Sequence, residues 1–114
     1  MLFRSKTRKL VGRQGKEYHL LDLDKVLALQ AERELVWIIT DRQRYLATQS
    51  LASLQERIDD PEFERVHRNA IVNVNHVRKM TALSSQRWLI TLSNSLEIVA
   101  SKRQANRIRH LLHW

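Results

Sequence analysis

The chain has 114 residues, 43% of them hydrophobic, which is enough to bury one core and short for two, so a single domain spanning residues 1–114 is expected. Cysteine is absent, which excludes disulfides, a thiolate nucleophile and cysteine-ligated metal sites and favours a reducing cytoplasm. The formal charge of +8, from 20 Lys and Arg against 12 Asp and Glu, favours a polyanionic partner, with nucleic acid ahead of an anionic membrane surface.

The N-terminal residues carry basic side chains at Arg4, Lys6 and Arg8, and residues 1–7 are expected to form a flexible leader. This segment lacks the long apolar stretch and the cleavage site of a signal peptide. No apolar run in the chain approaches the length of a membrane-spanning helix. The sequence therefore predicts a protein that stays in the cytoplasm and does not cross a membrane.

Short segments with strand character follow one another through the first half of the chain. A hairpin is expected to turn at Gly15, where two such segments meet. The segment with the strongest strand composition lies near the middle, because it combines β-branched and aromatic side chains. The expected strands are Lys9–Gln14, Lys16–Leu21, Lys25–Gln30, Leu35–Thr40 and Arg44–Ala47.

Two segments have the spacing of apolar residues that is typical of amphipathic helices. The first is expected at Leu51–Ile58, behind N-cap candidates at Thr48 and Ser50 and before Pro61. The second is expected to begin after an N-cap at Ser101. Its inward side is expected to comprise Ala105, Ile108, Leu111 and Leu112, and its outward side Lys102, Arg103, Arg107 and Arg109.

The second half of the chain adds further strands. An apolar run broken by asparagines at Ala70–Val77 predicts a strand and then a turn. A broken strand is expected to follow at Val77–Leu83, and a hairpin is expected from Arg87–Leu92 and Leu96–Ala100. Roughly eight to ten strands without βαβ alternation predict a mainly β fold of antiparallel sheets with two short helices. The residues expected to be largely buried are Val36, Trp37, Ile38, Ile71, Val72, Trp88, Leu89, Ile90 and Ile98.

The sequence contains no arrangement of residues typical of catalysis. Two glycines cannot supply a glycine-rich phosphate loop, no G-x-S-x-G nucleophile motif occurs, and the acidic residues are scattered. His67 and His76 lack the spacing of a helical metal motif, and arginines beside His110 and His113 oppose a bound cation. The chain is therefore expected to have no enzymatic activity, no cofactor and no metal site.

Three polar clusters suit nucleic-acid recognition, and loops at their positions can share one face of the fold. They are Glu32-Arg33-Glu34, His67-Arg68-Asn69 and Ser101-Lys102-Arg103. Arginine can bind guanine O6 and N7, and asparagine can bind adenine N6 and N7, so the mixture suits base edges as well as phosphates. Each cluster alone is more typical of a solvated surface than of a binding site. A small basic module that binds RNA or an acidic protein by charge is therefore the alternative.

From about Lys9 to Leu112 the chain resembles a complete LytTR domain, a family of bacterial DNA-binding domains. The resemblance rests on F-E-R-V-H-R-N-A-I-V-N at Phe63–Asn73, V-A-S-K-R at Val99–Arg103 and the segment Leu21–Glu32. It implies a transcriptional regulator with an elongated arrangement of small β-sheets, whose loops enter successive major grooves of double-stranded DNA at paired promoter repeats. It also implies a homodimer on DNA and a two-component system, with a receiver domain that this chain does not contain.

The same resemblance assigns roles to the three polar clusters. It places base contacts at Glu34, Arg68 and Arg103. It makes supports or phosphate contacts of Arg33, His67, Asn69, Ser101 and Lys102. The family usually has Asn or His followed by Tyr where this chain has Glu34 and Leu35. A carboxylate there repels phosphate, although it can accept a hydrogen bond from cytosine N4, so Arg68 and Arg103 are the stronger candidates.

Overall fold

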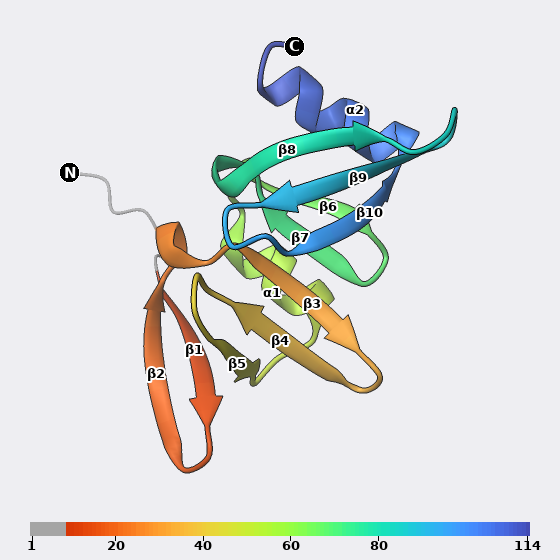
Figure 1. The fold of residues 1–114 in the computed structure, drawn as a ribbon. Helices are drawn as coiled ribbons and strands as arrows, with labels where there is room; N and C mark the ends of the chain where they lie inside the picture. Colours follow the sequence, from red (N-terminus) through yellow and green to blue (C-terminus); the bar gives the residue numbers. More distant parts are fainter. Residues whose placement is uncertain (1–8) are drawn as a thin grey trace, which may run out of the picture.

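The computed structural model describes residues 9–114, so the basic leader expected at residues 1–7 lies outside the described part. Within that part, ten strands and two α-helices form a mainly β fold (Figure 1). The strands are β1 (Lys9–Gln14), β2 (Glu17–Asp22), β3 (Ala28–Glu32), β4 (Leu35–Ile39), β5 (Arg44–Ala47), β6 (Phe63–His67), β7 (Ala70–Asn73), β8 (Val77–Ala82), β9 (Arg87–Leu92) and β10 (Glu97–Ser101). The helices are α1 (Leu51–Ile58) and α2 (Lys102–Leu111), with 3₁₀ turns at Leu23–Lys25 and Val74–His76. The predicted fold class is confirmed.

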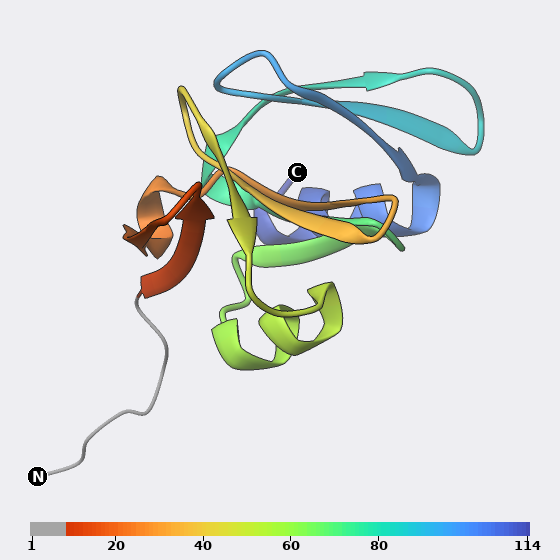
Figure 2. The same ribbon diagram turned by 90° about the horizontal axis from the view of Figure 1, so that it is seen from below.

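The strands form one large and one small antiparallel sheet. The seven-stranded sheet has the order β2-β1-β5-β4-β3-β7-β6, and the three-stranded sheet has the order β10-β9-β8. Two pairings, β1 with β5 and β3 with β7, join segments far apart in the chain. Figure 2 shows α1 and the three-stranded sheet on opposite sides of the large sheet. The large sheet is therefore the middle layer, and each of its two faces borders a separate core.

The core beneath the large sheet is closed by α1. The buried face of this helix consists of Leu51, Leu54 and Ile58, and it packs on side chains from β3, β4 and β7. Ser50 caps the helix, because its Oγ accepts a hydrogen bond from the backbone N–H of Ser53 at 3.1 Å. The predicted helix and its predicted N-cap are confirmed.

The second core lies between the large sheet, the three-stranded sheet and α2. Its largest buried members are Leu27, Val66, Val72, Ile90, Leu92, Ile98 and Ile108. The one buried polar side chain of the described core is Asn73, whose Nδ2 donates to the carbonyl oxygen of Val26 at 3.0 Å. Its Oδ1 accepts a hydrogen bond from the N–H of Asn75 at 3.1 Å, so both the nitrogen and the oxygen of the amide group have hydrogen-bond partners. Asn73 therefore ties the end of β7 to the segment that leads into β3.

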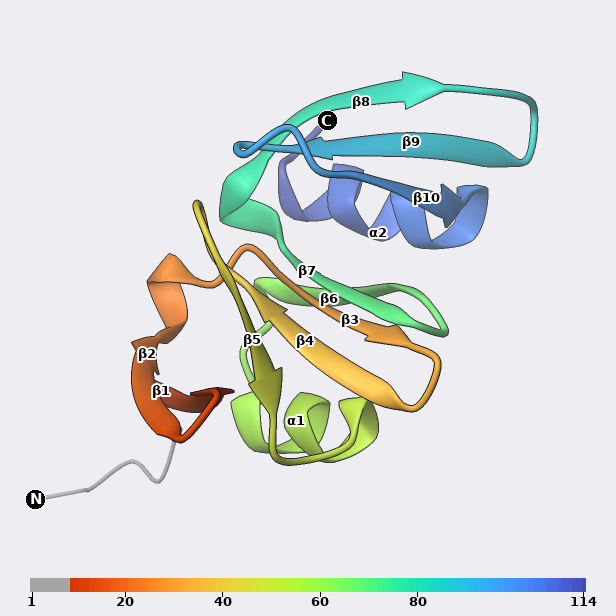
Figure 3. The ribbon, with the colours of Figure 1, turned by 60° about the horizontal axis from the view of Figure 1, so that its bottom comes forward.

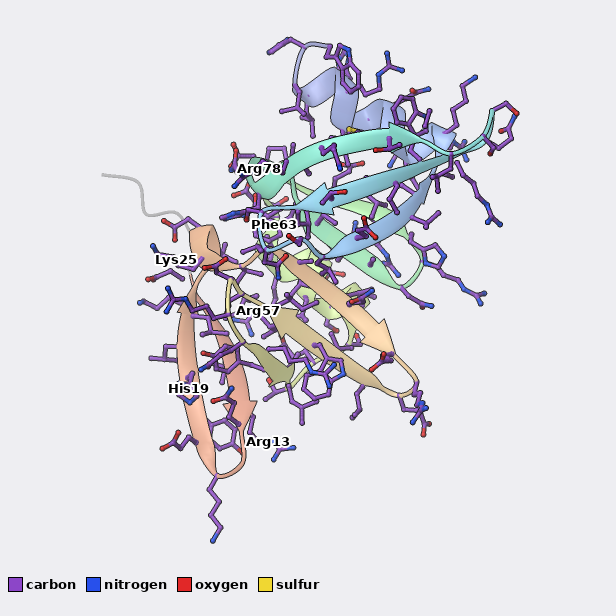
Figure 4. All side chains as sticks on the ribbon, in the orientation of Figure 1. Arg13, His19, Lys25, Arg57, Phe63 and Arg78 are labelled. Atoms are coloured by element: carbon purple, nitrogen blue, oxygen red, sulfur yellow. The ribbon has the colours of Figure 1, made fainter. Side chains whose placement is uncertain are left out.

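The hairpin of β1 and β2 forms the outer end of the large sheet, and Figure 4 labels Arg13 and His19 on its two strands. At the open end of the hairpin, Lys9 Nζ donates to the carboxylate of Asp22 at 2.8 Å. This hydrogen bond and the positive charge of Lys9 lower the pKa of the Asp22 carboxyl group below its ordinary value. The predicted hairpin about Gly15 is confirmed.

Several sequence-based expectations about burial need correction. Ile38, Ile71, Val72, Ile90 and Ile98 are buried as expected, whereas Val36, Trp37, Trp88 and Leu89 are only half-buried. Trp37 belongs to neither core, and the guanidinium of Arg44 lies 3.9 Å from the centre of its ring. Leu111 and Leu112 are exposed, because the contact of α2 with the core ends at Ile108.

Two expectations about element boundaries also need correction. The strand predicted to begin at Lys25 begins at Ala28, because Leu23–Lys25 forms a 3₁₀ turn. The structure also contains β6, for which the sequence showed no clear strand signal. Within residues 9–114, no helix is long and apolar enough to cross a membrane.

Candidate nucleic-acid interface

The three polar clusters lie along one edge of the molecule, although they are far apart in the sequence. They occupy the β3–β4 turn, the β6–β7 turn and the junction of β10 with α2. Figures 1, 2 and 3 show these connections on the same side, together with the β8–β9 turn. In Figure 4, side chains extend outward from this edge. We call it the turn edge, defined by Arg33, Glu34, His67, Arg68, Asn69, Ser101, Lys102 and Arg103.

The middle of the turn edge is the tight connection between β6 and β7. His67 pairs with Ala70, so Arg68 and Asn69 form a two-residue turn, and both are exposed. The imidazole Nδ1 of His67 accepts a hydrogen bond from the backbone N–H of Asn69 at 3.1 Å. This bond places the ring proton of a neutral His67 on Nε2, which remains available as a donor to a ligand.

Below it lies the β3–β4 turn, which contains Arg33 and Glu34. Arg33 has a φ of 60°, in the left-handed region, as a tight hairpin turn requires. The backbone N–H of Ala31 donates to the carbonyl oxygen of Asn69 at 2.8 Å. This hydrogen bond fixes the positions of the β3–β4 and β6–β7 turns relative to each other.

The upper part of the turn edge is the start of α2. Ser101 caps this helix, because its Oγ accepts from the N–H of Gln104 at 3.3 Å. The N–H of Lys102 donates to the carbonyl oxygen of Gln86 at 2.9 Å, which joins the helix start to the β8–β9 turn. Lys102 and Arg103 are exposed beside the positive end of the helix dipole, an arrangement that favours phosphate groups.

The cations of the turn edge are not neutralised by the protein itself. Within residues 9–114, no hydrogen bond or ion pair involves the side chains of Arg33, Arg68, Lys102 or Arg103. The nearby acid Glu32 lies 3.9 Å from Arg44, whereas Glu34 is exposed and places one negative charge at the lower turn. The edge therefore offers several free cationic donors to an anionic partner.

Sequence reasoning missed two residues that organise this edge. Arg65 is half-buried on β6, and its guanidinium group donates hydrogen bonds to the carbonyl oxygens of His67 and Arg68. Gln86 holds the start of α2 through its backbone carbonyl group. Both roles depend on contacts that form only in the folded chain, although Arg65 lies within the quoted stretch F-E-R-V-H-R-N. In the part of the chain that the structure describes, no group of His, Asp or Glu side chains is arranged to hold a metal ion.

Comparisons with known proteins place this geometry in a family. The profile of the LytTr DNA-binding domain matches residues 16–113. A solved LytTr DNA-binding domain from Bacillus cereus has the same fold, with a TM-score of 0.84 at 21% sequence identity, covering 95% of this chain and 99% of that one.

Curated relatives extend the similarity. The sensory transduction protein LytR of Staphylococcus saprophyticus is 20% identical over 96% of this chain and 43% of its own length. The heme-containing CO-sensing transcriptional regulator RcoM 2 of Paraburkholderia xenovorans is 28% identical over 82% of this chain and 35% of its own length. This chain thus spans less than half the length of these relatives. Because the family profile covers nearly all of the described residues and the fold matches a solved member, the chain belongs to the LytTr DNA-binding domain family.

Proposed function

We propose that this chain binds double-stranded DNA in a sequence-specific manner and regulates transcription without catalysing a reaction. The observation that carries the proposal is the turn edge, on which three connections from distant parts of the chain present unpaired cationic side chains. Membership of the LytTr DNA-binding domain family supports the same conclusion. The relatives whose names describe sensory transduction or transcriptional regulation support a regulatory role.

The chemistry of the side chains supports a division of roles along the edge. Arg68 and Arg103 read base edges in the major groove, because a planar guanidinium can donate two hydrogen bonds to guanine O6 and N7. Lys102 contacts phosphate as a point charge at the helix N-terminus. Glu34 accepts from cytosine N4. The remaining residues, Arg33, His67, Asn69 and Ser101, contact phosphate or support the turns.

The size of the molecule supports contact with more than one groove. Its two largest extents are 43 and 39 Å. Successive major grooves on one face of B-DNA lie about 34 Å apart, so a protein of this size can reach two of them. The turn edge runs from the β3–β4 turn to the start of α2. We place its two ends in successive major grooves, with one chain at each of the paired promoter repeats.

The wider context is part of the proposal. We place the protein in the cytoplasm, in a two-component pathway with a receiver domain, and as a homodimer on paired repeats. The lengths of the curated relatives support a further domain beside the DNA-binding domain, because this chain matches only 43% of LytR and 35% of RcoM 2. Measuring the stoichiometry on duplexes with one repeat or two would test the dimer: two chains should bind the paired repeat, and a single chain there would contradict it.

A competition assay tests the proposed function against the alternative of a basic module that binds by charge. A duplex selected from genomic fragments is labelled and bound, and unlabelled selected duplex, random duplex, RNA and an acidic peptide compete for the protein. The selected duplex should compete at a far lower concentration than the other competitors. Equal competition by random duplex, or stronger competition by RNA or the peptide, would contradict sequence-specific DNA binding.

A further inference from the structure

The guanidinium group of Arg65 connects three separate pieces of backbone and side chain. Its Nε donates to the carbonyl oxygen of His67 at 3.2 Å, and its Nη2 donates to the carbonyl oxygen of Arg68. Its Nη1 donates to the side-chain Oε1 of Gln55 on α1 at 2.9 Å. Two of the three acceptors are therefore the main chain of the β6–β7 turn, and the third lies on the helix beneath the sheet.

The position of Arg65 on β6 allows this contact. The pairing of β6 with β7 shifts register between Arg65 and His67, so Val66 is the extra residue of a β-bulge and is fully buried. A bulge bends its strand and changes the direction of the neighbouring side chains. Arg65 thereby lies against the turn that follows the bulge, and its side chain is half-buried between that turn and α1.

The backbone of the turn is consequently held at every residue. Arg65 binds the carbonyl oxygens of His67 and Arg68, the imidazole of His67 binds the N–H of Asn69, and the N–H of Ala31 binds the carbonyl oxygen of Asn69. Fixing these peptide planes fixes the direction in which the side chain of Arg68 leaves the turn. A pre-ordered side chain loses less conformational entropy on binding, which favours affinity for the one partner that fits its direction.

We propose that Arg65 is a positioning residue, which sets the base preference of the DNA-binding surface through the β6–β7 turn without touching DNA, and which is itself held by Gln55 of α1. This inference rests on the proposed function, because the proposed function is what assigns a base contact to Arg68. Arginine suits the role because its planar fork can reach three acceptors at once, whereas lysine keeps the charge but not the geometry.

The first arm of the test measures DNA binding. Arg65→Lys should raise the Kd for the selected duplex about tenfold and leave the Kd for random duplex unchanged, since the charge is kept and only the ordering of the turn is lost. The matched control is Arg57→Lys, because Arg57 is exposed on α1 and makes no hydrogen bond to the turn within residues 9–114 (labelled in Figure 4). Full retention of the preference for the selected duplex in Arg65→Lys would overturn the proposal.

The second arm needs no DNA and so separates this inference from the proposed function. Amide hydrogen exchange is measured for Asn69 and Ala31 in wild-type protein, Arg65→Lys and Arg57→Lys. Exchange at both amides should accelerate in Arg65→Lys alone, with the amides of α1 and the free energy of unfolding unchanged. Unchanged exchange at Asn69 would overturn the positioning role. If exchange accelerates but the wild-type protein does not distinguish the duplexes, the proposed function fails and the control of the turn by Arg65 stands.

The third arm tests the contact with α1. Gln55→Ala removes the acceptor of Nη1 and should reproduce part of the loss in Arg65→Lys, whereas Gln55→Glu retains an acceptor and should preserve the preference for the selected duplex. In the double variant that combines Arg65→Lys with Gln55→Ala, the losses of the two single variants should not add, because both substitutions act through one set of hydrogen bonds. Additive effects, or a Gln55→Ala variant that binds like the wild type, would remove α1 from the mechanism.

Discussion

Arg68 and Arg103 occupy different turns, and neither side chain is engaged within residues 9–114, so each is free to bind a base edge. Replacing either by Ala should cost about 1–3 kcal/mol on the selected duplex and relax preference at one base pair. Arg→Lys at the same positions should lose most of that preference, because lysine lacks the bidentate fork. The control is Arg42→Lys in the β4–β5 turn, which lies at the end of β4 opposite to the β3–β4 turn. Unchanged preference in both Arg→Lys variants would exclude these residues from base reading.

Lys102 is predicted to act differently from the two arginines. Because Lys102 is proposed to contact phosphate, Lys102→Ala should weaken binding to all duplexes alike. It should also reduce the slope of log affinity against log salt by about one unit. Affinities measured at several salt concentrations for the selected and random duplexes test this directly. A loss confined to the selected duplex would instead make Lys102 a base-reading residue.

Asp22 carries the residue-scale prediction for pH. Its pKa is lowered by the hydrogen bond from Lys9 and then by the charge of Lys9, so its carboxylate favours folding above its ordinary pKa. That contribution is lost as pH falls through the lowered pKa. An NMR titration should show that the pKa of Asp22 returns towards its ordinary value in Lys9→Ala. Lys25→Ala is the control, because the charge of Lys25 lowers the pKa of Asp22 less than Lys9 does. No change in Lys9→Ala would show that the pair is not formed in solution.

At the scale of elements, the structural role of the N-cap of α2 can be separated by experiment from its proposed binding role. Ser101→Ala removes an acceptor for the N–H of Gln104 and should lower the free energy of unfolding by about 0.5–2 kcal/mol. Ser101→Asp keeps a good cap and should restore the stability, but its negative charge should weaken DNA binding beside Lys102 and Arg103. Chemical denaturation and duplex binding measured on both variants separate the two roles. Equal DNA affinity in wild-type protein and Ser101→Asp would place the start of α2 away from the phosphates.

Elements with a strong local signal were predictable from the sequence. The helix at Leu51–Ile58 and its cap at Ser50 follow from apolar spacing and a preferred capping residue, and the hairpin at Gly15 follows from alternation about a turn. β6 was missed because three of its five residues, in Phe63–His67, are charged or imidazole side chains, and its pairing with β7 includes a bulge. Trp37 was expected in a core, because local composition does not show which part of a sheet another layer covers.

At the scale of the whole molecule, the residue types of the candidate interface were predictable, but the way in which folding brings them to one edge was not. The sequence identified Arg68 and Arg103 as candidates from their chemistry and from the family resemblance. Their common edge depends on the pairing of β3 with β7 and on the hydrogen bond from Lys102 to Gln86, which join distant segments. The same holds for Arg65, whose acceptors on Gln55 and the β6–β7 turn are brought together only by folding.

The most direct test of the turn edge as the DNA-binding surface is an NMR titration of the labelled protein with the selected duplex. The largest changes in backbone amide shifts should fall at residues 33–34, 67–69 and 101–103, in three separate parts of the sequence. The β1–β2 hairpin at the other end of the large sheet should remain unchanged and serves as the internal reference. Changes centred on that hairpin, or changes spread evenly over all the basic side chains, would contradict recognition of DNA by the turn edge.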